Sequence, residues 1–197
     1  MKMLAAAAAM MVAGSAMGDE TILDEDFEGG VIPADWTIID NVGNGTGYDI
    51  MSPSTMDGSM YMVGFDSDAF GHADYDTEIR TPVMDMLNVH FLVLEYDADY
   101  ENYANLDFFD VDISYDGGVN WDNLVSYNDD MGIFHETMHF YSQSMFTVIR
   151  FHYYDPSRTD DWDWHSFIDN VLIYPVIPAP GTLALLGLGG LAIRRRR

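Results

Sequence analysis

Two histidines and a glutamate in the middle of the chain have the spacing of a zinc-binding motif. His135-Glu136-Thr137-Met138-His139 matches H-E-x-x-H, in which a helix brings both imidazoles to one zinc ion beside the glutamate. The flanking residues show no N-cap box and no long amphipathic pattern, so they do not predict a helix. On a β-strand the histidines share a face but lie about 13 Å apart, too far for one zinc ion. We therefore expect no catalytic residue and keep a zinc metalloprotease only as an alternative.

Carboxylates are the most abundant chemical groups of the chain. Its 197 residues hold 33 acidic and 8 basic side chains, a formal net charge of −25, and no cysteine. All the acids lie between Asp19 and Asp169, where they face only three arginines. This charge excludes nucleic acid as a partner, because phosphates are bound through lysine and arginine. The acidic side chains repel one another, which favours bound cations, and calcium is coordinated by carboxylate oxygens. Without cysteine there is no disulfide framework.

Two tryptophans lie among acids before the last predicted strand. The segment reads Asp160-Asp161-Trp162-Asp163-Trp164-His165. An exposed tryptophan can stack on a sugar ring, so Trp162 is a candidate glycan contact. Whether Trp162 is exposed or buried stays open at this point. For Trp164 we expect burial in the core.

The elements that must position these residues are β-strands. Apolar residues alternate with polar ones from Phe109 to Tyr115, the period of a half-buried strand. Apolar, β-branched and aromatic runs predict further strands at His90–Tyr96, Thr147–Tyr154 and Ile168–Tyr174. Turn signals separate the runs, and no amphipathic helix is evident. The pattern predicts an all-β fold, an antiparallel β-sandwich of the jelly-roll type.

One turn has a mechanism of its own. Ser114-x-Asp116-x-Gly118-x-Asn120-Trp121 has the form of an Asp box, a hairpin corner found in several β proteins. The aspartate can accept backbone N–H bonds, the glycine supplies a left-handed position, and the tryptophan packs back under the hairpin. We expect this box to be structural.

The N-terminal residues predict export. A lysine at position 2 precedes an apolar run, and small residues follow at Ala16 and Gly18. This is the pattern of a secretory signal peptide over residues 1–18, with a short signal helix.

The C-terminal residues predict sorting and anchoring over residues 175–197. A Pro-Ala-Pro sequence leads into a leucine- and glycine-rich run that ends in four arginines. The segment resembles the PEP-CTERM sorting signal of Gram-negative bacteria, although Ala179 stands at the usual glutamate. The resemblance implies an exosortase-type processing enzyme as a partner, a hydrophobic anchor helix and contact with the membrane. A plain tail anchor is the alternative. The residues that carry the signal are Pro178, Pro180, Arg194, Arg195, Arg196 and Arg197.

The central domain, residues 19–174, carries motifs of one family in order. These motifs are Asp26-Phe27-Glu28-Gly29-Gly30, Glu78-Ile79-Arg80-Thr81-Pro82-Val83, the segment 111–121, Ile149-Arg150-Phe151-His152-Tyr153-Tyr154, and Phe167-Ile168-Asp169-Asn170-Val171. Together they resemble the choice-of-anchor J and cleaved-adhesin domains, with MAM domains as more distant relatives. The resemblance covers residues 22–174 and implies a jelly roll.

The same resemblance implies a structural calcium ion where the first and last strands meet. The matching positions are Glu28 and Asp169, with Asp66 or Asp68 as a third ligand. It also implies a non-enzymatic, exported protein of the cell envelope or extracellular matrix that serves adhesion or contacts polysaccharide. A carbohydrate-binding module of defined specificity is the alternative function.

Overall fold

The computed structural model describes residues 16–17, 21–71, 73–88, 91–104, 106–157 and 163–177. The sorting residues, the expected anchor helix, Trp162 and most of the expected signal helix lie outside the described residues.

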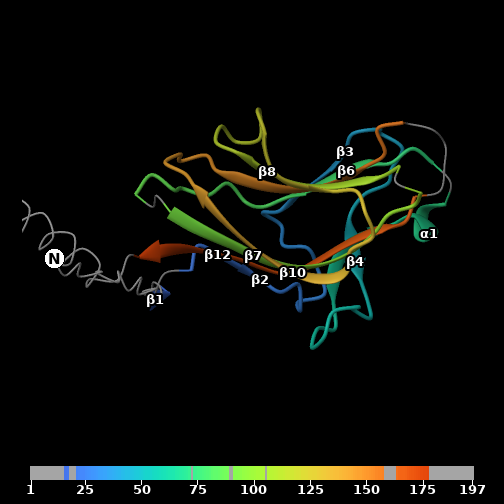
Figure 1. The fold of residues 1–197 in the computed structure, drawn as a ribbon, viewed down its shortest axis with the longest axis horizontal. Helices are drawn as coiled ribbons and strands as arrows, with labels where there is room; N and C mark the ends of the chain where they lie inside the picture. The colour runs from blue at the N-terminus through green and yellow to red at the C-terminus, as the bar shows by residue number, and fades with distance from the viewer. Residues whose placement is uncertain are drawn as a thin grey trace, which may run out of the picture.

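The described chain folds into two antiparallel β-sheets that lie face to face (Figure 1). The elements are β1 (Ala16–Met17), β2 (Leu23–Glu25), β3 (Thr37–Asp40), β4 (Asp49–Met51), β5 (Met62–Asp66), α1 (Ser67–Phe70), β6 (Asp76–Arg80), β7 (Phe91–Glu101), β8 (Phe108–Ser114), β9 (Asp122–Tyr127), β10 (Gly132–Tyr141), β11 (Val148–Tyr154) and β12 (His165–Ile177). One sheet has the order β10-β7-β12-β5-β4, and β1 and β2 also pair with β12. The other sheet has the order β3-β6-β11-β8-β9. The predicted all-β sandwich is confirmed.

The alternation read from the sequence decides which side chains enter the core. On β8, Phe109, Val111 and Ile113 are buried, whereas the polar residues between them point to the outer face. The neighbouring β11 buries Ile149, Phe151 and Tyr153 in the same way. Side chains two residues apart on a strand share a face, so each sheet presents one apolar face to the other.

Aromatic rings fill the space between the sheets. Phe65 of β5 stacks on Tyr153 of β11 with ring centroids 5.1 Å apart. Tyr96 of β7 meets the edge of Phe151 at 5.2 Å. Aromatic pairs in these geometries stabilise a fold beyond the area that they bury. They therefore hold together a sandwich that contains no disulfide.

The predicted Asp box forms the β8–β9 corner. The Asp116 carboxylate accepts N–H bonds from Val119 and Asn120, and the Ser114 hydroxyl also donates to it. The backbone and side-chain hydrogen bonds from Asn120 are the main cause that lowers the pKa of Asp116 to about 2. Trp121 is half-buried and faces the guanidinium of Arg150 at 4.5 Å. The box is a fold element, as expected.

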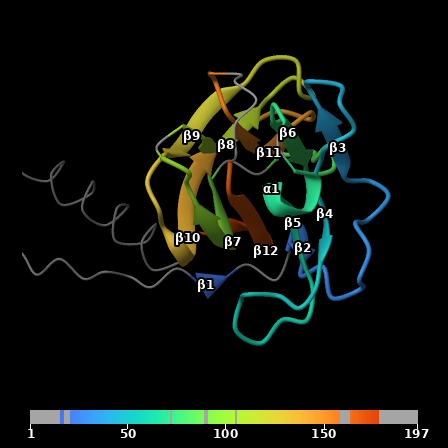
Figure 2. The same ribbon diagram turned by 90° about the vertical axis from the view of Figure 1, so that its right-hand side faces the viewer.

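The helix α1 has a single turn and lies at one end of the sandwich, which faces the viewer in Figure 2. The Asp66 side chain caps it by accepting the N–H of Asp68, and the turn ends at Gly71 with a positive φ. Within the described ranges, no helix has the length and apolar character needed to cross a membrane.

Candidate functional site

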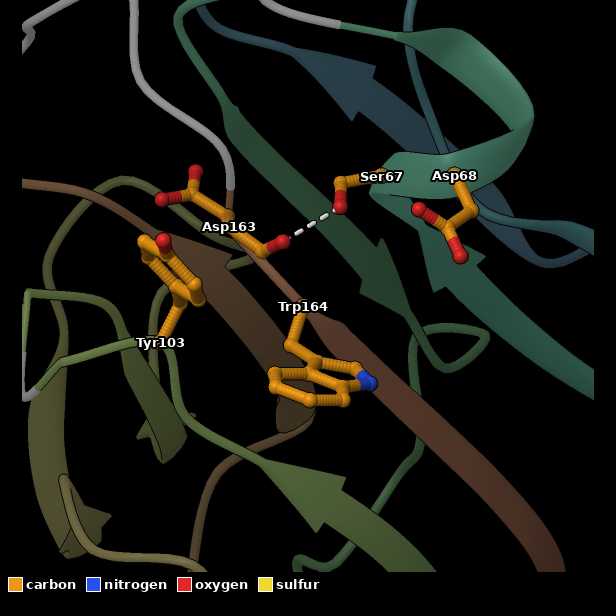
Figure 3. Close-up of a pocket in the computed structure, with 5 residues that line it drawn as sticks. All are labelled: Ser67, Asp68, Tyr103, Asp163 and Trp164. Carbon is orange, nitrogen blue, oxygen red and sulfur yellow. Dashed lines mark hydrogen bonds between the residues drawn. The ribbon is translucent and has the colours of Figure 1, made fainter.

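A hollow of about 310 Å³ opens at the α1 end of the sandwich (Figure 3). Ser67 and Asp68 of α1 form one wall, Tyr103 comes from the loop after β7, and Asp163 and Trp164 directly precede β12. Three separate segments therefore build the site. Its volume is at the lower end of the range that small ligands occupy in proteins.

Two aromatic side chains stand exposed at this hollow. Tyr103 is 43% exposed and Trp164 is 46% exposed. Their ring centroids are 6.3 Å apart and their planes are inclined at 44°. Exposed indole and phenol faces of this kind can stack on the apolar face of a sugar ring. We call this pair the aromatic platform.

The exposure of Trp164 corrects the expectation that it packs into the core. Both of its backbone groups are bonded, since its N–H donates to the Tyr153 hydroxyl at 3.0 Å and its carbonyl accepts the Ser67 N–H at 2.9 Å. The preceding residue, Asp163, is buried. Neighbouring side chains of an extended segment point in opposite directions, so the indole faces outward.

One buried carboxylate ties both platform residues together. Asp107 is fully buried, and its Oδ1 accepts the backbone N–H of Tyr103 at 2.8 Å. Its Oδ2 accepts the hydroxyl of Tyr153, the same hydroxyl that receives the Trp164 N–H. The platform therefore rests on a hydrogen-bonded chain inside the protein.

The electrostatics of this chain follow from burial. Burial raises the pKa of Asp107, and the hydrogen bonds from Tyr153 and from the Tyr103 backbone offset part of that rise. Burial also raises the pKa of Tyr153 well above its ordinary value, and the negative charge of Asp107 adds to the rise. Tyr153 is therefore a neutral phenol that donates its proton to Asp107.

The sequence patterns did not identify Tyr103 or Asp107 as site residues. Tyr103 lies in a loop without periodicity, and Asp107 is one of 33 acidic residues. The one available signal is that Asp107 stands just before the alternating strand.

Two of the predicted calcium ligands, Glu28 and Asp169, interact electrostatically. Asp169 is fully buried, and its Oδ2 has no hydrogen-bond partner of good geometry among the described residues. Burial is the main cause that raises the pKa of Asp169 to about 6. Hydrogen bonds from Ser59 and the Asn170 backbone offset part of the rise, and the negative charges of Glu28 and Asp97 add to it. Glu28 lies nearby and accepts the N–H groups of Met60 and Tyr61.

Asp66 and Asp68 lie elsewhere. Asp66 pairs in register with His165, four residues before Asp169 on β12. At ~3.3 Å per residue, Asp66 therefore lies about 13 Å from Asp169 along the sheet. Asp68 lines the hollow beside the aromatic platform. Asp97 pairs in register with Asp169. It is therefore a third acidic residue beside Glu28 and Asp169, in place of Asp66 or Asp68.

The zinc motif lies on an edge strand. Residues 135–139 belong to β10, where His135 and His139 point to the same exposed face four residues apart. His135 bonds to Asp97 at 2.7 Å. The helix that a metalloprotease site requires is not formed at these residues, and two imidazoles about 13 Å apart do not share one metal ion.

A further group of possible ligands lies on the outer face of the five-stranded sheet. Among the described residues, Asp110, Asp112 and His152 bring potential ligand atoms within 4.8 Å of one another. Arg150 donates to Asp112 at 2.8 Å, so a guanidinium already supplies positive charge there. We assign no metal to this group.

Comparison with known proteins shows the fold class. No protein-family model matches the sequence, and no curated protein matches it either. The K3 cleaved adhesin domain of Lys-gingipain from Porphyromonas gingivalis is similar in structure, with a TM-score of 0.57 and 20% identity over 78% of this chain and 98% of that one.

Two carbohydrate-binding modules are also similar. TmCBM61, solved in complex with β-1,4-galactotriose, has a TM-score of 0.55 and 12% identity over 80% of this chain and 99% of that one. The C-terminal family 22 module of Clostridium thermocellum Xyn10B has a TM-score of 0.52 and 12% identity over 79% and 93%. At these identities the likeness establishes a shared β-sandwich fold.

Proposed function

We propose that this protein is an exported, non-enzymatic β-sandwich module that contacts polysaccharide outside the cell, in adhesion or matrix assembly. The observation that carries the proposal is the aromatic platform of Tyr103 and Trp164, held half-exposed over a hollow of ligand size. Exposed aromatic residues beside hydrogen-bonding groups are the usual means of binding sugars. That adhesin and carbohydrate-binding domains share the fold supports the proposal.

Affinity electrophoresis in gels that contain neutral polysaccharides tests this function. We expect at least one of galactan, xylan and β-glucan to retard the protein, and Trp164→Ala to remove the retardation. The matched control is Tyr141→Ala, because Tyr141 is also 46% exposed but lies on β10. Equal retardation of the wild type and Trp164→Ala would overturn the proposal.

We also propose that a calcium ion stabilises the fold. The orphan oxygen of buried Asp169, with Glu28 and Asp97 beside it, fits a hard cation that prefers carboxylates. A bound cation would offset the mutual repulsion of the Glu28, Asp97 and Asp169 carboxylates.

A thermal melt tests the calcium site. Millimolar Ca²⁺ added after EDTA is expected to raise the melting temperature by roughly 5 °C. Asp169→Asn should abolish this response. Asp66→Asn should retain it, because Asp66 lies about 13 Å away along the sheet. A response to Ca²⁺ that survives Asp169→Asn contradicts this site.

Export and anchoring complete the proposal. The signal over residues 1–18 and the PEP-CTERM-like segment over 175–197 would direct the module through the inner membrane and to an exosortase-type enzyme. Fractionation of cells that express the full chain, or a chain that ends at residue 177, tests this. Only the full chain should be found with the membrane before processing.

A further inference from the structure

The described residues that line the hollow beside the aromatic platform carry charge of one sign. Among them, the charged side chains are Asp68, which is exposed, and Asp163, which is buried. The Ser67 hydroxyl is engaged because it donates to the carbonyl of Asp163. The described lining therefore offers a ligand two aromatic faces and the exposed carboxylate of Asp68.

The arginines of the described ranges lie in a different part of the molecule. Arg80 and Arg150 belong to β6 and β11 and are paired with Glu78 and Asp112 at 2.7 to 2.9 Å. Both guanidiniums lie over Trp121 on the outer face of the five-stranded sheet. With a net charge of −25, the field of the protein attracts cations and repels acidic polymers.

We infer that the hollow takes a sugar unit with a free ammonium group, as in a de-N-acetylated amino-sugar polymer. The inference rests on the proposed glycan-binding function and names its ligand class. In the view of Figure 3 the indole of Trp164 lies below Tyr103 and Asp68, and the hydrogen bond from Ser67 to Asp163 lies between those two residues. Aromatic faces attract an ammonium group through their π electrons. The Asp68 carboxylate adds a charge-assisted hydrogen bond.

Calorimetric titration with two oligosaccharides of equal length tests the inference. The probes are a β-1,4-linked tetramer of glucosamine and the corresponding tetramer of N-acetylglucosamine, at low salt and about pH 6, where the free amine is protonated. We expect the glucosamine tetramer to bind about fivefold more tightly. The preference should shrink as salt is added.

Two variants locate the effect. Asp68→Asn should remove the preference, so that the two tetramers bind this variant with equal affinity. Asp122→Asn is the matched control, because it removes the same charge from an exposed residue far from the hollow. Asp122 pairs with Ile113 near the end of β8, whereas Asp107 stands just before the start of that strand. This control should keep the preference.

The outcomes separate the inference from the function on which it rests. Equal binding of the two tetramers, or tighter binding of the N-acetylated one, overturns the inference and leaves glycan binding intact. A tetralysine peptide that binds as tightly as the glucosamine tetramer overturns the assignment to a sugar. If neither tetramer binds and no neutral polysaccharide retards the protein, the proposed function itself fails.

Discussion

Asp107 is fully buried, yet its two oxygens bond to residues that shape the protein surface. The Tyr103 backbone donates to one oxygen, and Tyr153, which receives the Trp164 N–H, donates to the other. A buried polar group left without its partner costs about 1–3 kcal/mol. The position of the platform is therefore coupled to the stability of the fold through individual hydrogen bonds.

Removing the Tyr153 hydroxyl should affect both properties. Tyr153→Phe removes the hydroxyl that donates to Asp107 and accepts the N–H of Trp164, so we expect the free energy of unfolding to fall by about 2 kcal/mol. Glycan affinity should fall as well, because Trp164 loses one of the two backbone hydrogen bonds that fix its position. Urea unfolding followed by tryptophan fluorescence measures the first effect, and affinity electrophoresis measures the second.

Tyr154→Phe is the matched control for that variant. It removes a hydroxyl from the next residue, whose partner is Asp110 rather than the Asp107 chain. Its glycan affinity should equal that of the wild type. Equal losses of affinity in the two variants would mean that the Tyr153 hydroxyl has no special part in holding the platform.

The pKa of Glu78 predicts a loss of stability in acid. Burial alone would raise this pKa, but hydrogen bonds from Arg80 and Asn41 and the charge of Arg150 outweigh burial, and the pKa lies below its ordinary value of 4.5. A carboxylate with a lowered pKa in the folded state contributes stability that is present above the unfolded pKa. This stability is lost as the pH falls through the folded pKa.

Glu78→Gln should therefore cost about 3 kcal/mol at neutral pH and progressively less below about pH 4.5. The difference in unfolding free energy between the wild type and the variant, measured in urea across this pH range, checks the expectation. A difference that is constant with pH would contradict the role of the Glu78 charge.

At the scale of elements, the alternation of apolar and polar residues correctly predicted which side chains of a strand are buried. The strands β8 and β11 alternate in sequence as they do in space, and the Asp box formed where its spacing indicated. The negative charge of Glu28 adds to the raised pKa of Asp169, and the calcium site that the resemblance implies at these two residues stays a prediction. Trp164 was predicted wrongly, since backbone bonds to Tyr153 and Ser67 decide its direction.

The Asp box provides a prediction about one glycine. Gly118 has φ +91°, and an added Cβ would lie 3.0 Å from Arg80 Nη1 and 3.3 Å from the Trp121 ring. Gly58 has the same φ of +91° with nothing within 4 Å. Both changes to alanine incur the strain of a positive φ, about 1 kcal/mol. Gly118→Ala should cost about 1 kcal/mol more, because the hairpin must also move.

Urea unfolding of the two alanine variants separates strain from crowding. If Gly118→Ala and Gly58→Ala destabilise the protein equally, the packing of the hairpin on Arg80 and Trp121 contributes nothing. Gly43, with φ +81° and open surroundings, provides a second reference for strain alone.

At the scale of the whole molecule, charge opposes folding. The chain carries a net charge of −25, and the described arginines are already paired with acids. Compacting so many like charges costs free energy that dissolved ions reduce by screening.

Salt should therefore stabilise the protein. Raising NaCl from about 0.05 M to about 0.5 M in EDTA is expected to increase the melting temperature by ~5 °C, because the screening length shortens to a few ångströms. Differential scanning calorimetry measures this shift. A melting temperature that stays constant or falls would show that ion pairs, rather than net repulsion, dominate the electrostatics.

The hydrogen-bonded chain beneath the platform makes the binding site depend on the folding of the whole sandwich. Tyr103 and Trp164 are 61 positions apart in the sequence, and they become neighbours only when β7, β8 and β11 have assembled around Asp107. The proposed recognition of sugars would therefore require a completely folded chain, and a chain still being exported would not bind them.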